Sequence, residues 1–158
     1  MNRPAGPFPL ERFDWMQQAN PSQVAHMKLL VNIDVPALAP ALAFYLPAFG
    51  LHVGRRFGDD AIELLGADAP IYLLHKAPAT LAAGNAHRDY NRHWTPIHCD
   101  VVVDDLDAAL ARAIAAGAMQ EGATRETVWG RIVQISDPFG HGWCLLEFSG
   151  RGYDEIAT

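Results

Sequence analysis

The stretch TPIHCDVVVDDL, residues 95–106, places a histidine and an aspartate close together in an otherwise apolar segment. Side chains alternate along an extended strand, so His98, Asp100 and Val102 share one face. An imidazole and a carboxylate on one β-branched face can bind a metal ion or orient a small polar ligand. We therefore predict that this face lines a concave surface enclosed by protein.

The first half of the chain predicts a strand, a helix and three further strands. Residues 28–35 have the apolar pattern of a strand. A helix is indicated next by apolar residues at helical spacing, closed by a glycine: Leu38, Leu42, Tyr45, Phe49 and Gly50. Pro47 should bend or shorten this helix, because proline lacks the N–H of a helix interior. Strands are expected over residues 51–57, 61–65 and 71–75.

The same order of elements returns in the second half. A strand over residues 97–103 leads into a helix that is capped by Asp104 or Asp105 and ended by Gly117. The apolar positions at helical spacing on this helix are Leu106, Leu110 and Ile114. Strands are predicted near residues 119–124, 131–136 and 142–148, and a type I turn over residues 137–140 joins the last two.

Two βαβββ modules, residues 27–76 and 96–150, therefore make up an α+β domain. A sheet with a helix on one face leaves its other face open, so the two sheets are expected to curve around a cleft, with the imidazole of His98 inside. Residues 1–26 are interpreted as an N-terminal arm, residues 77–95 as a linker and residues 151–158 as a C-terminal tail.

Composition restricts the function classes. The 158 residues carry a net charge of −6 and no basic cluster, so nucleic acid is not an expected partner. No apolar run is long enough to cross a bilayer, and the N-terminus lacks the apolar core of a secretory signal. Two cysteines do not make a disulfide framework. We expect a cytoplasmic protein, without membrane contact, that binds a small-molecule ligand.

Three segments resemble the vicinal oxygen chelate superfamily, which includes glyoxalase I, extradiol dioxygenases and the fosfomycin and bleomycin resistance proteins. These segments are VNIDVPALAPALAFYLPAFGL, HCDVVVDDLDAALARAIAAGA and ISDPFGHGWCLLEF. The resemblance covers residues 27–150. It implies a metal-binding cleft between the modules, and a homodimer, as is common in the superfamily.

The resemblance also implies where a metal would be held. His98 matches the ligand histidine at the start of the second module's first strand, whereas the equivalent first-module residue is Leu30, which cannot bind a metal. The ligand positions of the last strands fall on Tyr72 and Cys144. A divalent Zn, Fe, Mn or Ni ion is therefore expected at His98, Cys144 and Tyr72.

Each of these residues has a second interpretation. His98 can be a hydrogen-bonded pocket histidine, and Cys144 a small buried apolar residue, with no metal bound. Asp100 can bind the metal, orient the imidazole or act as a catalytic base, and Asp34 is the other candidate base. Trp94 can wall the mouth of the cleft and bind substrate, or pack in a dimer interface or under the arm.

Polar residues of the first strand are expected to face the same cleft. Asn32 and Asp34 lie opposite Asp100 by pseudo-symmetry, so the three can converge and orient a ligand. They can equally hydrogen-bond one another or bridge the modules through water. If Asp34 and Asp100 approach closely, one should hold its proton near neutral pH. Three further charged residues are interpreted as surface groups: Glu63, Glu147 and Arg55. His141 is expected to hydrogen-bond the backbone of its own turn.

Two functions fit these residues best. The first is a metal-dependent lyase or dioxygenase of the glyoxalase type, in which one ion polarises two neighbouring substrate oxygens. The second is a metal-free binding protein of the bleomycin-resistance type, which Leu30 favours because it removes one ligand. A metal-independent isomerase or epimerase that uses paired carboxylates is a third.

Overall fold

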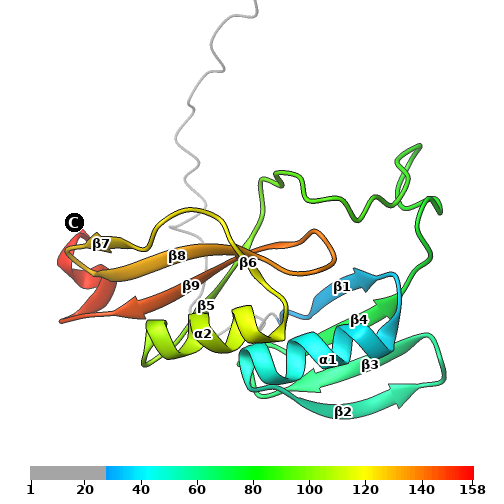
Figure 1. Ribbon diagram of the computed structural model, residues 1–158, viewed down its shortest axis with the longest axis horizontal. Coiled ribbons are helices and arrows are strands. Elements are labelled where there is room, and N and C mark those ends of the chain that lie inside the picture. Colours follow the sequence, from blue (N-terminus) through cyan, green and yellow to red (C-terminus); the bar gives the residue numbers. More distant parts are fainter. Residues whose placement is uncertain (1–27) are drawn as a thin grey trace, which may run out of the picture.

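The first module consists of one helix and a four-stranded sheet (Figure 1). The computed structural model describes residues 28–158, so the arm predicted for residues 1–26 lies outside the described residues. The strand order is β1-β4-β3-β2, and β1 is parallel to β4. The elements follow the predicted order: β1 (Val31–Val35), α1 (Leu38–Phe49), β2 (His52–Phe57), β3 (Ala61–Leu65) and β4 (Ile71–His75).

The second module repeats this plan with one difference. Its elements are β5 (Cys99–Val102), α2 (Leu106–Ala116), β6 (Met119–Gln120), β7 (Arg125–Thr127), β8 (Gly130–Ser136) and β9 (Gly142–Phe148), followed by a 3-10 turn, Gly152–Glu155. The main strand order is β5-β9-β8-β6, and β7 also pairs with β8. Of the strand predicted over residues 119–124, only Met119–Gln120 is a strand, and β7 follows just beyond the predicted range. Gly122 separates them with a φ of +99°, a left-handed conformation that interrupts an extended chain.

The two sheets pair their strands at equivalent positions. Asn32 lies opposite Tyr72 in the parallel pair β1–β4, and Asp100 lies opposite Cys144 in the parallel pair β5–β9. These are the positions that the sequence comparison of the two halves equates. The predicted α+β fold of two βαβββ modules is confirmed, and both β1 and β5 are edge strands.

Both helices end at the predicted glycines, Gly50 and Gly117. Asp105 caps α2 by accepting a hydrogen bond from the backbone N–H of Ala108 at 2.9 Å. Pro47 does not shorten α1 as expected, because the helix continues for two residues beyond it. So close to the end of a helix, proline removes one hydrogen bond and little more. Within the described residues, no helix has the length and apolar character needed to span a membrane.

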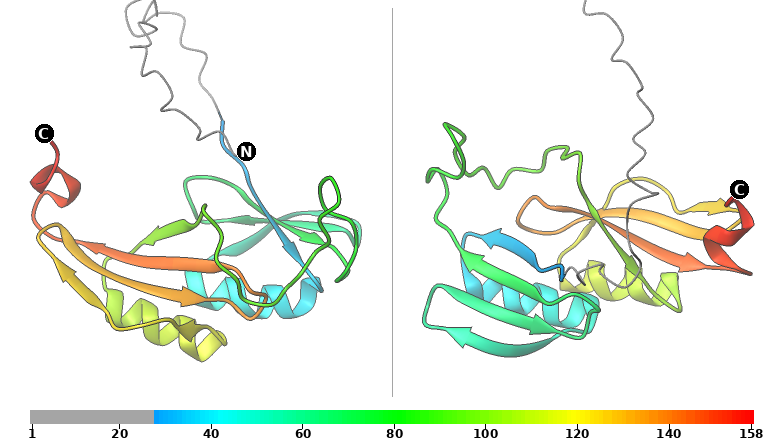
Figure 2. Two further views of the ribbon diagram at one scale, coloured as in Figure 1. Left: turned by 90° about the horizontal axis from the view of Figure 1, so that it is seen from above. Right: turned by 180° about the vertical axis from the view of Figure 1, so that it is seen from behind.

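The two helices pack against each other where the modules meet, as Figures 1 and 2 show. The buried positions of the two helices include four small residues, Ala41, Ala48, Ala109 and Ala113. Of the apolar positions of α2, Leu106 is buried and Leu110 half-buried, whereas Ile114 is 46% exposed. The buried face of α2 therefore consists of Leu106 and two alanines, which the spacing of large apolar residues does not predict.

A buried carboxylate joins the first helix to the second module. Asp137, in the turn between β8 and β9, accepts hydrogen bonds from the hydroxyl of Tyr45 on α1 and from the indole of Trp143 on β9. Its other oxygen accepts from the backbone N–H groups of Phe139 and His141. The imidazole of His141 contacts the same carboxylate at 2.8 Å instead of the turn backbone.

These hydrogen-bond partners determine the ionisation states of Asp137 and Tyr45. Burial raises the pKa of Asp137, but the hydrogen bond and charge of His141, together with the hydroxyl of Tyr45, outweigh it and hold that pKa below its ordinary value. Burial and the charge of Asp137 raise the pKa of Tyr45, so the phenol keeps its proton and remains the donor. The carboxylate is therefore ionised in the folded protein, with its acceptor positions satisfied.

We predict that Asp137→Asn lowers the free energy of unfolding by about 3 kcal/mol, because an amide cannot accept all of these bonds. A carboxylate whose pKa is lowered by folding stabilises the protein above its ordinary pKa of about 3.9, and this contribution is lost at lower pH. The difference from wild type in urea titrations should therefore hold from pH 7 to pH 5 and shrink below about pH 4. Asp107→Asn is the control, because this exposed carboxylate pairs with Arg131 at the surface. Equal stabilities of Asp137→Asn and wild type would contradict the role assigned to Asp137.

Candidate metal centre

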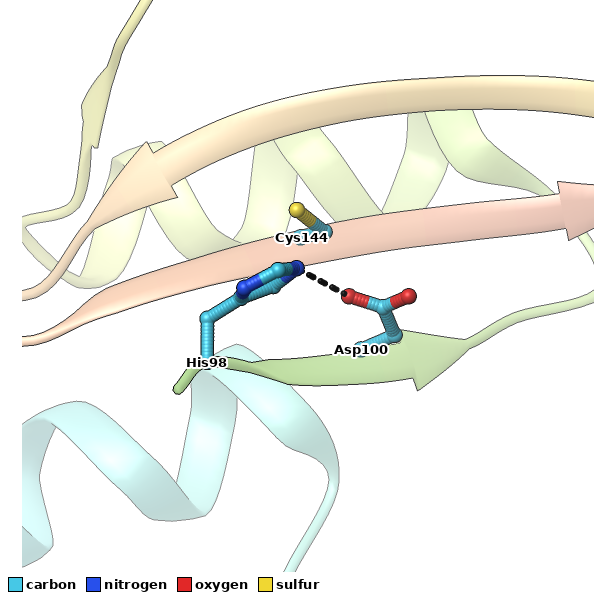
Figure 3. A group of neighbouring side chains, drawn as sticks. All are labelled: His98, Asp100 and Cys144. Carbon is cyan, nitrogen blue, oxygen red and sulfur yellow. Dashed lines mark ion pairs between the residues drawn. The ribbon is translucent and has the colours of Figure 1, made fainter. Parts of the chain in front are cut away.

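Three potential metal ligands converge on the open face of the second sheet (Figure 3). They are His98, Asp100 and Cys144, and their ligand atoms all lie within 4.8 Å of one another. The parallel pairing of β5 and β9 places Asp100 directly beside Cys144. His98 precedes β5 by one residue and lies on the same face, with its Nε2 atom 3.4 Å from Oδ1 of Asp100.

The three side chains differ in exposure. Cys144 is buried, whereas the side chains of His98 and Asp100 are 41% and 34% exposed. Burial, with the charge of Asp100 and a hydrogen bond to it, raises the pKa of the Cys144 thiol to about 11. The thiol therefore keeps its proton at neutral pH until a cation replaces it.

This donor set fits a divalent transition metal. It offers one imidazole nitrogen, one carboxylate oxygen and one sulfur, which are the ligand types that zinc accepts. Catalytic zinc sites use three protein ligands and leave a position for water or substrate. The exposure of His98 and Asp100 leaves such an opening on the sheet face.

Trp94, a predicted substrate-binding residue, lies beside the cluster. It is exposed, and its ring centroid is 6.3 Å from that of His98. Trp129, in the turn between β7 and β8, packs on the rings of Phe148 and Tyr153. A tryptophan in a short turn carries no sequence signal of the rings that it contacts.

Asp34, a polar residue of β1, has a partner outside this cluster. It forms an ion pair with Arg88 of the linker, with a distance of 2.7 Å between Oδ2 and Nε. Asn32 lies on the same face of the first sheet. Neither residue lines the cavity that Asp100 borders.

Tyr72 lies on the first sheet and has other partners. Its hydroxyl donates to Glu63 and accepts from Arg55, both at 2.8 Å. The expectation that Glu63 is a surface carboxylate was wrong, because it is buried beneath the guanidinium of Arg55, which donates to both of its oxygens. The hydrogen bonds from Arg55 and Tyr72 lower the pKa of Glu63 to about 2. An ion pair thus occupies the first-sheet counterpart of the metal cluster.

A family model described as a glyoxalase-like domain matches residues 30–146. An uncharacterized protein of Mycobacterium bovis is 31% identical over 132 residues, which cover 74% of this chain and 86% of that protein. An uncharacterized protein of Mycobacterium tuberculosis strain H37Rv has the same identity, and the match covers 76% of its length.

Solved structures share the fold at low sequence identity. The fosfomycin resistance protein FosX from Listeria monocytogenes superposes with a TM-score of 0.61 at 17% identity, covering 79% of this chain and 95% of that one. Lactoylglutathione lyase from Agrobacterium tumefaciens gives a TM-score of 0.56 at 19% identity, with coverages of 79% and 96%. TioX from Micromonospora sp. ML1 gives a TM-score of 0.60 at 19% identity, with coverages of 78% and 99%.

Proposed function

The chain belongs to the glyoxalase-like domain family of the vicinal oxygen chelate superfamily, and we propose that it is a metal-dependent enzyme of the lyase or dioxygenase type. Its substrate is a small molecule with two neighbouring oxygen atoms. The observation that carries this proposal is the convergence of His98, Asp100 and Cys144 on one sheet face. Two structural neighbours support it: one is named a lactoylglutathione lyase, and a FosX variant is described as complexed with Mn(II) and a dihydroxypropylphosphonic acid.

The three residues would hold the cation, and zinc is the metal that a nitrogen, oxygen and sulfur donor set favours over Fe, Mn or Ni. When bound, the ion acts as a Lewis acid that polarises oxygen atoms of the substrate. His98 would bind the ion through a ring nitrogen, and Cys144 would bind it as the thiolate, after its thiol has lost a proton. Oδ1 of Asp100 lies toward the imidazole, and its second oxygen is the candidate acceptor for a substrate proton. Asp34 is less available for that role, because Arg88 holds it.

We predict that the metal-free protein binds one Co(II) or Zn(II) ion per chain. The Co(II) form should show a thiolate charge-transfer band, because Cys144 is a ligand. His98→Ala should weaken binding by more than the 10–100-fold that the loss of an outer partner costs. Cys144→Ser should abolish the band. Absorption titrations and metal analysis of the purified variants measure these effects.

Tyr72→Phe is the control variant for the metal titration. The sequence resemblance makes Tyr72 a ligand, whereas its phenol is hydrogen-bonded to Glu63 and Arg55 on the first sheet. We expect the metal affinity of this variant to equal that of the wild type. A loss of affinity similar to that of His98→Ala would show that Tyr72 is a metal ligand. Substoichiometric metal in the wild-type protein, with no band in the Co(II) form, would contradict the proposed centre.

One observation favours a second function, a metal-free binding protein on the same scaffold. Leu30 stands where the first module would carry the counterpart of His98, and an ion pair occupies the position near Tyr72. On this alternative, the protein sequesters a small molecule and breaks no bond.

Ligand-induced stabilisation separates the two functions. For the enzyme, we predict that acetohydroxamate, a chelator with two neighbouring oxygens, raises the melting temperature of the Zn(II)-loaded protein and has no effect after treatment with EDTA. A ligand at 100 times its dissociation constant stabilises the folded state by about 2.7 kcal/mol, which a thermal-shift assay resolves. A screen that finds only ligands indifferent to EDTA would overturn the enzyme proposal in favour of sequestration.

A further inference from the structure

A cavity of about 580 Å³ lies between the two modules, apart from the metal cluster. Its first-module wall comes from the start of β1, the end of α1 and the turn between β3 and β4. Its second-module wall comes from β5, α2 and β9. Because β1 and β5 are both edge strands, no strand closes the gap between them in the described part of the chain.

The cavity extends along the edge of β5 and lies mainly on its helix-covered side, whereas the metal cluster lies on the open face. Val101 and Val103 line the cavity and pack toward the helix-covered core. His98 and Cys144 lie on the opposite, open face of the sheet and do not line it. Only Asp100 belongs to both the cavity wall and the cluster. The cavity is therefore not the metal site described above.

The walls of the cavity are mainly apolar. Phe49 and Trp143, whose ring centroids are 4.9 Å apart, both line it, together with several alanine and valine side chains. Ligand pockets for small molecules typically have volumes of about 300–1,000 Å³ and combine apolar walls with a few polar groups. The volume and the walls thus suit a small apolar molecule.

The charged side chains at the cavity wall indicate which polar group a ligand would carry. Arg112 of α2 lines the cavity, and among residues 28–158 no carboxylate forms an ion pair with it. A guanidinium without a carboxylate partner binds a carboxylate or sulfonate through paired hydrogen bonds. Asp68 and Asp100 also reach the wall and repel negative charge, so the acidic group of a ligand is confined to the side of Arg112.

We propose that this cavity is a second ligand site that takes a small amphipathic monoanion, an aromatic or aliphatic carboxylate or sulfonate. The acidic group pairs with Arg112, and the apolar body packs against Phe49 and Trp143. The site is distinct from the metal centre, because its walls belong to the module junction and Asp100 alone of the three potential metal ligands reaches them.

Fluorescence titration with 8-anilinonaphthalene-1-sulfonate, an aromatic monoanion, tests the proposal on the full chain. We expect one saturable site per chain, equally strong with and without EDTA and in His98→Ala. Arg112→Gln should weaken binding about tenfold, the loss expected for a hydrogen bond to a charged group. Ala67→Trp, at an exposed position of the turn that lines the cavity, should abolish binding by filling the mouth.

Two matched variants control for general effects of these changes. Arg56→Gln removes an exposed arginine of β2 that does not line the cavity, and Ala123→Trp adds an indole to an exposed loop of the second module. Both should bind the probe as the wild type does. Circular dichroism of each variant checks that it is folded.

A competition experiment tests the sign of the charge. Octanoate should displace the probe, and octylammonium, a cation of equal chain length, should not. Several outcomes overturn the proposal: no saturable binding, binding that survives both Arg112→Gln and Ala67→Trp, displacement by octylammonium as effective as by octanoate, or loss of binding in His98→Ala. Because the metal titration uses a different readout, failure of this site and failure of the metal centre are distinguishable.

Discussion

The contact between the two modules is the constraint on which the rest of the structure depends. Small side chains let α1 and α2 approach each other, and the carboxylate of Asp137 binds the hydroxyl of Tyr45 from across the junction. A buried carboxylate tolerates few alternative arrangements, because every acceptor position must stay occupied. This packing directs the helices toward each other, and it leaves the metal cluster on an open sheet face and the apolar cavity between the edge strands.

The pairing of β5 with β9 creates the candidate metal centre. Parallel pairing places Asp100 beside Cys144 in the second module and Asn32 beside Tyr72 in the first. The backbone is the same in both, so the difference is chemical. The second module presents an imidazole, a carboxylate and a thiol, whereas the first module satisfies its buried Glu63 with an internal cation. A repeated fold can therefore hold two unlike charge arrangements at equivalent positions.

The fold was largely predictable because its signals are local. Alternating apolar residues, the Asp105 cap and the helix-ending glycines are each visible within a few residues. The packing between elements was less predictable. Burial of the alanine face of α2 in place of Ile114 depends on how close α1 comes, and the continuation of α1 through Pro47 depends on how few helix bonds remain after it.

The candidate site was predictable to the extent that it lies within one sheet. His98 and Asp100 were found from strand alternation, and Cys144 from the resemblance, and the register joins all three. Arg55, which binds both Glu63 and Tyr72, comes from β2, and its ion pair with Glu63 depends on a cross-strand approach that no short sequence pattern records.

The location of all three donors in one module has a physical consequence. The β5–β9 ladder fixes Asp100 beside Cys144, and His98 directly precedes β5, so the spacing does not depend on the angle between the modules. Enclosure of a substrate over the cluster does depend on what stands opposite the open face. In the proposed enzyme, the second sheet would hold the cation by itself, whereas the exclusion of water needed for chemistry would require a surface from outside this sheet. On that proposal, metal affinity and catalytic rate would respond to different parts of the chain.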